Sequence, residues 1–216
     1  MAIASYTELK DTVERYLART DRDSEIPDWI RLTEAEVARK LKLRSQQKTT
    51  TGTLTGGSEA LLTPAGILYP ELLVFDTQPP QPIEIVSLPQ GEAFAFSDAN
   101  DATPRKASIW GVNASYQTQI RVWPTPPSDV DYTLYYRDDI TPLTAAAPVN
   151  YLLLVAPDVY LYGCLFHGHL FDQDTEAAGI WRQPFDGAIR EVKRIEAMAR
   201  AKGGLLRMRP SSGMTP

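Results

Sequence analysis

Two histidines, His167 and His169, are the residues of this chain best suited to bind a transition metal or to act as a general base. At a spacing of two they point about 200° apart on a helix, so they cannot share one metal as residues four apart could. The single cysteine, Cys164, lies in the apolar run LYGCLF and can form neither an internal disulfide nor a cysteine zinc cage. We therefore predict no metal site and no cofactor.

Other catalytic signatures are equally weak. The sequence contains neither a G-x-S-x-G nucleophile elbow nor a Walker loop. The glycine-rich GTLTGG at residues 52–57 is not followed by a lysine, which favours a β turn over a phosphate loop. The acidic neighbours Asp98 with Asp101, and Asp138 with Asp139, lack a third ligand and are typical of solvated turns. We predict that the protein is not an enzyme.

Aromatic side chains in the middle of the chain could instead stack on nucleobases or sugars. No arginine cluster stands beside them in the sequence, which favours a role in cores or interfaces. If these side chains contact a sugar, the protein would be a carbohydrate-binding module, which stays an alternative hypothesis. They are Trp110, Tyr116, Trp123, Tyr132, Tyr135 and Tyr136.

Charge is distributed unevenly along the chain. The net charge of -5 argues against a general nucleic-acid binder. Residues 182–216 nevertheless carry eight lysines and arginines against three acidic residues. Three explanations stay open for this basic end. It docks on an acidic partner, it touches DNA, or its cations stabilise the negative C-terminal end of the last helix.

The elements that must position these residues begin with two helices. A capping box of Ser5 and Glu8 precedes a helical apolar period, which predicts a helix over 6–19. Pro27, at a first helical position, predicts a second helix over 27–43. Asn150 caps another helical segment, which Pro157 restarts as a run that is apolar on nearly every face through Phe171. Such a helix is central to a bundle or covered by a neighbouring subunit.

The last helix follows an acidic turn. Asp172 or Asp174 is its expected cap, Pro184 should kink it, and Gly203 with Gly204 should end it.

Between residues 46 and 148 the helical period disappears. The runs ELLVF and IEIVSL, joined by QPPQP, predict a hairpin. A second pair is expected where the strand around Ile120 and Val122 leads through PTPP to a strand at Tyr132–Tyr136. The stretch SDANDATPRKA is expected to be looser.

These elements together predict an α+β fold. We expect a helical bundle of about four helices that is interrupted by a small antiparallel β insertion. The expected parts are N-terminal helices at 1–45, the β-rich insertion at 46–148, C-terminal helices at 149–202 and an extended tail at 203–216.

The sequence resembles a known family over nearly its whole length. The segment APDVYLYG at 156–163, the acidic turn after it, and Trp181 followed by Phe185 and Ala188 are similar to the C-terminal signature of phage head-to-tail adaptors of the SU10 type. Upstream, YTELKDTVERYLARTD, IPDWIRLTEAEVARKLKLR, the P-x-P turn at 124–127 and TLYYRDDITPLT resemble family segments in the same order. His167, Gly168 and Pro184 depart from the family pattern.

The resemblance implies a structural virion protein that works at the head-to-tail interface and is present in the host cytoplasm during assembly. It implies a homo-oligomeric ring of twelve copies that binds the portal after DNA packaging and presents a surface to a downstream tail or nozzle protein. Genomic DNA in the channel would be touched nonspecifically, and no membrane is involved. A nucleic-acid-binding regulator that uses the basic C-terminal helix is the alternative.

Two sets of candidate residues follow. The portal-contact candidates lie in the basic end of the chain and are Arg200, Lys202, Leu205, Leu206, Arg207, Met208 and Arg209. The subunit-interface candidates are aromatic residues of the two C-terminal helices, namely Tyr160, Tyr162, Phe166, Trp181 and Phe185.

Overall fold

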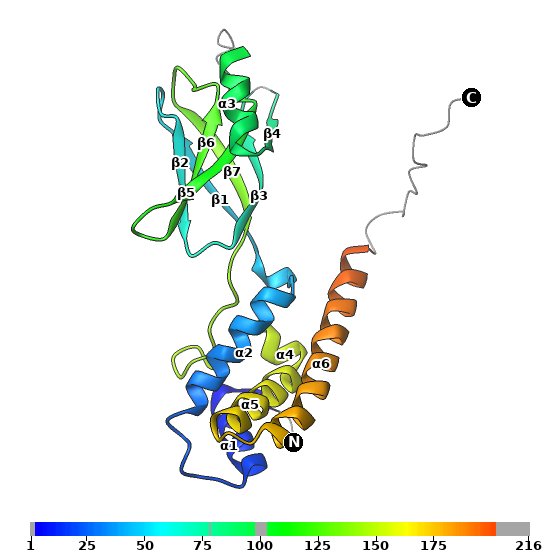
Figure 1. Cartoon of the computed structure of the whole chain (residues 1–216). Helices are drawn as coiled ribbons and strands as arrows, with labels where there is room; N and C mark the ends of the chain where they lie inside the picture. Colours follow the sequence, from blue (N-terminus) through cyan, green and yellow to red (C-terminus); the bar gives the residue numbers. More distant parts are fainter. Residues whose placement is uncertain (1–2, 78, 98–102, 202–216) are drawn as a thin grey trace, which may run out of the picture. The chain divides into compact units, whose positions relative to one another are not determined.

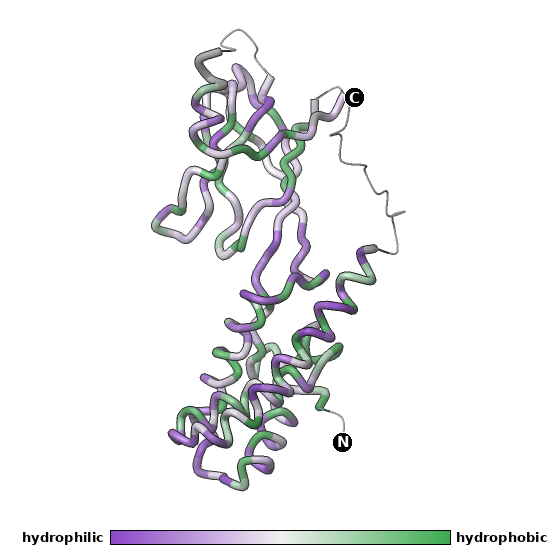
Figure 2. The backbone as a smooth tube through the Cα atoms, turned by 45° about the vertical axis from the view of Figure 1, so that its right-hand side comes forward, coloured by the Kyte–Doolittle hydropathy of each residue, from purple (hydrophilic) through white to green (hydrophobic). Residues whose placement is uncertain are grey.

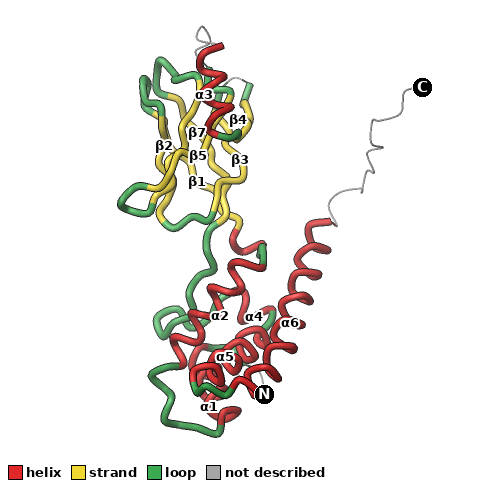
Figure 3. Tube along the Cα trace, viewed as in Figure 1, coloured by secondary structure: helices red, strands yellow, loops and turns green. Residues whose placement is uncertain are grey.

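A computed structural model of the chain describes residues 3–77, 79–97 and 103–201. The chain divides into two compact units. Of the described residues, those up to 44 and those from 140 to 201 form a helical unit, and those between 45 and 139 form a β unit. Figure 1 labels the elements and Figure 3 colours them by type.

The helical unit contains five of the described helices. They are α1 (Tyr6–Leu17), α2 (Ile26–Lys40), α4 (Tyr151–Val155), α5 (Pro157–Phe171) and α6 (Thr175–Ala201). A short 3-10 turn, Arg44–Gln46, follows α2.

Three of the helix starts are capped as the sequence predicts. The Ser5 hydroxyl accepts the Glu8 N–H at 3.3 Å, and the Asn150 side chain accepts the Leu153 N–H at 2.9 Å. Of the two candidates for the last helix, Asp174 is the cap, since its carboxylate accepts the Ala177 N–H at 3.0 Å. Short polar side chains at these positions satisfy N–H groups that the helix itself leaves without partners.

The core of the helical unit is built around α5. This helix packs against α1, α2, α4 and α6 of its own chain, and Val159, Cys164 and Leu165 on it are fully buried. Gly163 allows the close approach, because a Cβ atom there would lie 2.4 Å from Cγ2 of Thr33. Of the two explanations for an all-apolar helix, α5 therefore fits the first, the central helix of its own subunit.

α6 is the long amphipathic helix of this unit. Phe185, Ile189 and Val192 are buried on one side of it, whereas Arg190 and Lys193 are exposed. Figure 2 shows hydrophilic and hydrophobic residues alternating along its length. None of the helices in the described part of the chain is long and apolar enough to cross a membrane.

The β unit is a mixed seven-stranded sheet with one helix. Its strands are β1 (Gln47–Leu54), β2 (Ala60–Ala65), β3 (Tyr69–Phe75), β4 (Gln81–Ile85), β5 (Lys106–Val112), β6 (Gln117–Trp123) and β7 (Val130–Arg137), and its helix is α3 (Leu88–Ser97). The strand order is β1-β7-β3-β4-β5-β6-β2, and only the β4–β5 pair is parallel. The sheet curls into a nearly closed barrel (Figure 1).

The expected helical bundle with a small antiparallel β insertion is therefore wrong. The chain is α+β, but its β part is a seven-stranded unit with a core of its own. Leu73, Phe75, Ile120 and Leu134 are fully buried in that core. The segment looked small because β1 is largely exposed and rich in threonine and β2 is half exposed, so neither strand shows a strong apolar pattern.

The strand pairing was predicted only in part. The hairpin between ELLVF and IEIVSL is confirmed as β3–β4, with Leu73 opposite Ile83. The second expected pair is wrong, because β6 pairs with β5 and β2 while β7 pairs with β1 and β3. The PTPP segment therefore connects two strands that are not neighbours in the sheet.

Helix α3 was not predicted, although its start carries a signal. The Ser87 hydroxyl lies 2.9 Å from the Gln90 side-chain oxygen, which also accepts the Ser87 N–H at 3.3 Å. This is the Ser-x-x-Gln capping pattern.

Candidate functional site

A basic pocket lies where the end of α2 meets the second half of α6. The cavity has a volume of about 190 Å³. Four of its lining side chains are cationic, and Arg200, a portal-contact candidate, is one of them. The lining residues are Lys40, Lys42, Lys193, Glu196, Ala197 and Arg200.

Helix geometry brings these cations together. Lys193, Ala197 and Arg200 follow one another at spacings of four and three, so they share one face of α6. The Arg200 guanidinium donates a hydrogen bond to the backbone carbonyl of Lys42, which ties the end of α6 to the segment after α2. Cations at a helix C-terminus also suit its dipole, so part of this charge serves the helices themselves.

The one acidic residue in the pocket is already hydrogen-bonded. Glu196 is buried, and its carboxylate accepts the Arg44 N–H at 2.9 Å and the Tyr151 hydroxyl at 2.8 Å. The Arg44 guanidinium in turn donates to the Tyr151 oxygen at 2.9 Å. Because Glu196 is bound by these neighbours, the open part of the pocket carries positive charge and suits a carboxylate or phosphate.

Lys40 connects the basic pocket to a cluster of ion pairs. Its ammonium group lies 2.6 Å from Glu36 and 2.9 Å from Asp186, and Arg182 also binds both of these acids. Burial acts to lower the pKa of Lys40, but the hydrogen bonds to Glu36 and Asp186 outweigh it and raise this pKa above 10.5. Lys40 is therefore held charged and in a fixed position.

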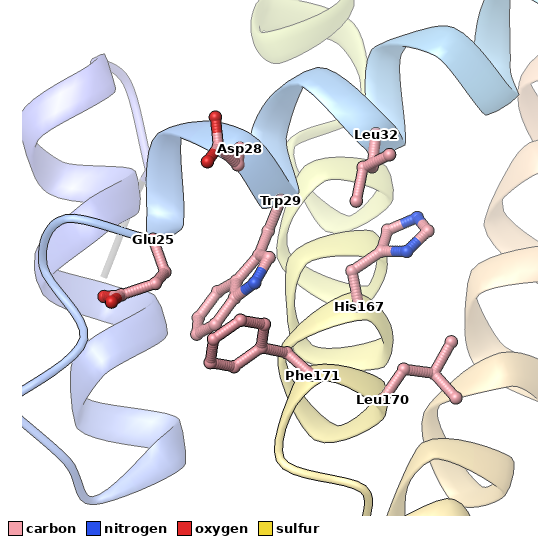
Figure 4. Close-up of a pocket in the computed structure, with 7 residues that line it drawn as sticks. All are labelled: Glu25, Asp28, Trp29, Leu32, His167, Leu170 and Phe171. Atoms are coloured by element: carbon pink, nitrogen blue, oxygen red, sulfur yellow. The ribbon is translucent and has the colours of Figure 1, made fainter.

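A second pocket, here called the apolar pocket, opens between α2 and the end of α5 (Figure 4). Its volume is about 320 Å³. Its wall is mainly apolar and aromatic, and two acidic residues from the start of α2 belong to its lining. The lining residues are Glu25, Asp28, Trp29, Leu32, His167, Leu170 and Phe171.

Aromatic packing shapes the apolar pocket. The Trp29 and Phe171 rings lie side by side, with centroids 6.1 Å apart (Figure 4). Gly168 makes room for Trp29, since a Cβ atom at that position would lie 3.1 Å from the indole ring. The glycine that departs from the family pattern therefore has a packing role here.

His167 lies between Leu32 and Leu170 in this pocket (Figure 4). Its Nε2 atom is buried, makes no hydrogen bond and lies 3.8 Å from a Glu36 carboxylate oxygen. Burial lowers the pKa of His167 below 6.5, although the Glu36 charge acts in the opposite direction. At neutral pH the ring is therefore uncharged.

The structure separates the five subunit-interface candidates into two groups. Tyr160 and Phe185 are fully buried, and the Tyr160 hydroxyl donates to Glu34 at 2.8 Å and accepts from Asn150 at 2.6 Å. These two residues have no surface to offer a neighbour, so we do not propose them for a direct contact.

The other three candidates reach the surface. Tyr162, Phe166 and Trp181 are half-buried. The Tyr162 and Trp181 rings stack with centroids 5.9 Å apart, and Tyr16 meets Trp181 edge-on at 6.1 Å. The Arg182 guanidinium lies 4.9 Å from the centre of the Phe166 ring. We call the Tyr16, Tyr162 and Trp181 rings, together with Phe166 four residues further along α5, the aromatic patch.

Only one portal-contact candidate can be located. Arg200 lines the basic pocket. The remaining ones, Lys202, Leu205, Leu206, Arg207, Met208 and Arg209, lie outside the described residues.

The residues suited to chemistry are dispersed. Within the described ranges no three His, Cys, Asp or Glu side chains come together as metal ligands. His169 lies 4.0 Å from Asp174, while His167 faces Glu36. Cys164 is fully buried, and burial raises the pKa of its thiol to about 12, which keeps it protonated near neutral pH.

The aromatic residues of the β unit are also divided between core and surface. Tyr132, Tyr136 and Trp123 are buried, while Trp110 and Tyr116 are exposed. The sequence shows no arginine cluster beside them, yet the Arg121 guanidinium lies 4.4 Å from the centre of the Trp110 ring. Strand pairing between β5 and β6 brings these two residues together, which sequence spacing does not show.

A comparison with models of protein families finds a match that spans nearly the whole sequence. A family model described as SU10 adaptor protein matches residues 4–209. No curated protein matches the chain. The matched range includes both units and the basic end of α6, and it confirms the resemblance seen in the sequence.

Proposed function

We propose that this chain, which belongs to the SU10 adaptor protein family, binds the portal of a tailed phage as a ring and links it to the tail after DNA packaging. Family membership makes the chain a phage adaptor and a component of the virion. The ring, its twelve copies, the portal contact and the downstream tail partner are our proposal.

The observation that best supports the portal contact is the basic pocket. It lies at the end of α6, where the chain continues into the predicted contact segment at 202–209. Lys42, Lys193 and Arg200 present positive charge there, and the one acidic residue of the lining is bound internally. Charge of one sign at an interface selects a partner of the opposite sign and speeds encounter. We propose that an acidic surface of the portal binds this pocket. The apolar and basic residues of the tail would enlarge the same contact.

The aromatic patch supports contact between copies. The Tyr162 and Trp181 rings stack on each other, the Phe166 ring contacts the Arg182 guanidinium, and all three rings are partly exposed, which is typical of interface anchors. In a ring, every copy would place this patch against the next one.

Charge reversal in the basic pocket tests the portal contact. We expect Lys193→Glu combined with Arg200→Glu to weaken binding to purified portal roughly tenfold or more, because each change replaces an attraction with a repulsion. Binding would be measured by co-sedimentation at two salt concentrations, since screening should weaken the wild-type contact. Deleting residues 203–216 should weaken it as well.

The control is Arg15→Glu, a charge reversal of the same kind at one exposed residue of α1 outside the basic pocket. It should leave portal binding intact. Portal binding by the double variant at wild-type strength would refute the contact. If the same double variant lost affinity for duplex DNA while its portal binding stayed unchanged, the nucleic-acid-binding alternative would replace the adaptor contact at this pocket.

A further inference from the structure

The apolar pocket combines exposed apolar side chains in its wall with two acidic residues at its edge. Leu32, Leu170 and Phe171 are 50%, 43% and 52% exposed, and Glu25 and Asp28 line the same cavity. Exposed apolar side chains that line a cavity together indicate a binding site, whereas single exposed apolar residues are common on any protein surface. The matching ligand is a segment that presents apolar side chains next to a cation.

The second half of α6 presents such a segment. Arg190, Arg194 and Met198 follow one another at spacings of four, so they lie on one face of the helix, and Ile195 adjoins them. Met198 is 54% and Ile195 39% exposed, and both arginines are exposed. Glu191 pairs with Arg194 on the same helix and neutralises part of this charge. We call these four residues, Arg190, Arg194, Ile195 and Met198, the α6 stripe.

The pocket and the α6 stripe cannot meet within one copy. Both belong to the helical unit, whose packed helices fix their positions. Arg190 comes fifteen residues after Thr175, the first residue of α6, which corresponds to roughly 22 Å along the helix. α6 starts just after Phe171, and its second half leads away from the end of α5 (Figure 1).

We infer that the apolar pocket receives the α6 stripe of a second copy of this chain. The apolar side chains of the stripe would cover Leu32, Leu170 and Phe171, and its arginines would lie near Glu25 and Asp28. Because two different surfaces pair, the contact is head-to-tail, and repeating it around an axis closes a ring. This inference rests on the proposed ring and adds the apolar pocket and the α6 stripe to the aromatic patch as surfaces that would join its copies.

A charge swap provides the test. Glu25→Lys with Asp28→Lys places cations at the pocket, and Arg190→Glu with Arg194→Glu places acids on the stripe. Each double variant alone should shift half-assembly to a roughly tenfold or more higher protein concentration, measured by mass photometry with and without portal. The chain carrying all four changes should recover assembly, because opposite charges face each other again.

Controls separate misfolding from a lost contact. Thermal unfolding followed by circular dichroism should be similar for all variants, and Asp11→Lys, an exposed acid on α1, should assemble normally. Should a double variant fail to fold, Leu170→Glu serves instead, since it places an acid on the exposed wall of the pocket.

The outcomes distinguish this inference from the proposed function. Normal rings from both double variants would overturn the inference and leave the portal ring standing. Normal rings with reduced portal binding by the pocket variant would show that the portal covers the pocket, which also overturns it. Wild-type protein that stays single on the portal would refute the ring itself.

Discussion

His167 is a buried histidine whose pKa lies below its ordinary value. Burial is the main cause that lowers its pKa, and Arg182 and Arg39 act in the same direction against the Glu36 carboxylate. Because the folded-state pKa is below 6.5, His167 binds a proton more tightly in the unfolded chain than in the folded chain. The stability that this residue contributes is therefore fully present above the unfolded pKa and is lost as the pH falls below it.

This sign leads to a pH prediction. We expect the free energy of unfolding to fall between pH 7.5 and pH 5.5, and we expect His167→Gln to show a flatter dependence over the same range. Urea unfolding at several pH values measures this. Glu36 and Asp186, whose pKa values are lowered by their cationic partners against the effect of burial, lose their contribution only at lower pH. An equally steep curve for the variant would exclude His167 as the cause.

Residue type was enough to select candidate site residues, but it could not show which residues lie beside them or which of them are exposed. Arg200 was selected from a run of charge, and the structure adds that Lys40 and Lys42 from a distant part of the sequence share its pocket. Tyr160 and Phe185 have the same aromatic character as Tyr162 and Trp181, yet only the latter two reach the surface. On α5 the helical pattern could not separate Tyr160 from Tyr162, because that helix is apolar on nearly every face.

The contact between α5 and α2 depends on a glycine. A Cβ atom at Gly163 would lie 2.4 Å from Cγ2 of Thr33 and 3.0 Å from Phe185. Thr33 has little freedom to move away, since it is buried and its hydroxyl donates to the Trp29 carbonyl at 2.8 Å. An added methyl group must therefore push the two helices apart.

We expect Gly163→Ala to destabilise the helical unit by about 1–3 kcal/mol, the usual cost of overpacking. The matched control is Gly179→Ala in α6, where a Cβ atom would meet nothing within 4 Å. That change should stabilise the helix by about 0.5–1 kcal/mol, because alanine favours the helical backbone. Chemical denaturation of both variants measures the difference, and equal effects would contradict the packing explanation.

Helices were more predictable than strands for a physical reason. Caps such as Asn150 and the restart at Pro157 act within a few residues, so the sequence displays them directly. Pairing of β6 with β2 joins segments that lie more than fifty residues apart, and no local signal encodes it. Helix α3 had a local signal at Ser87 and Gln90, but the apolar run IEIVSL was assigned to a strand through Leu88, where the helix begins.

For the molecule as a whole, the resemblance to a family predicted more than the hydrophobic pattern of the sequence did. The helical unit and the β unit each have a separate core, and the second of these was underestimated as a small insertion. The family match across residues 4–209 was nevertheless foreseen, since it depends on the order of many short motifs and not on how the strands pair.

The assembly of the protein on the portal is the most direct test. Purified wild-type chain should be mixed with purified portal, and the complex imaged by electron microscopy and weighed by native mass spectrometry. We expect a closed ring with one copy of this chain for each portal subunit, with the end of α6 against the portal. A portal that stays bare, or that carries isolated copies at saturating concentration, would contradict the proposed function.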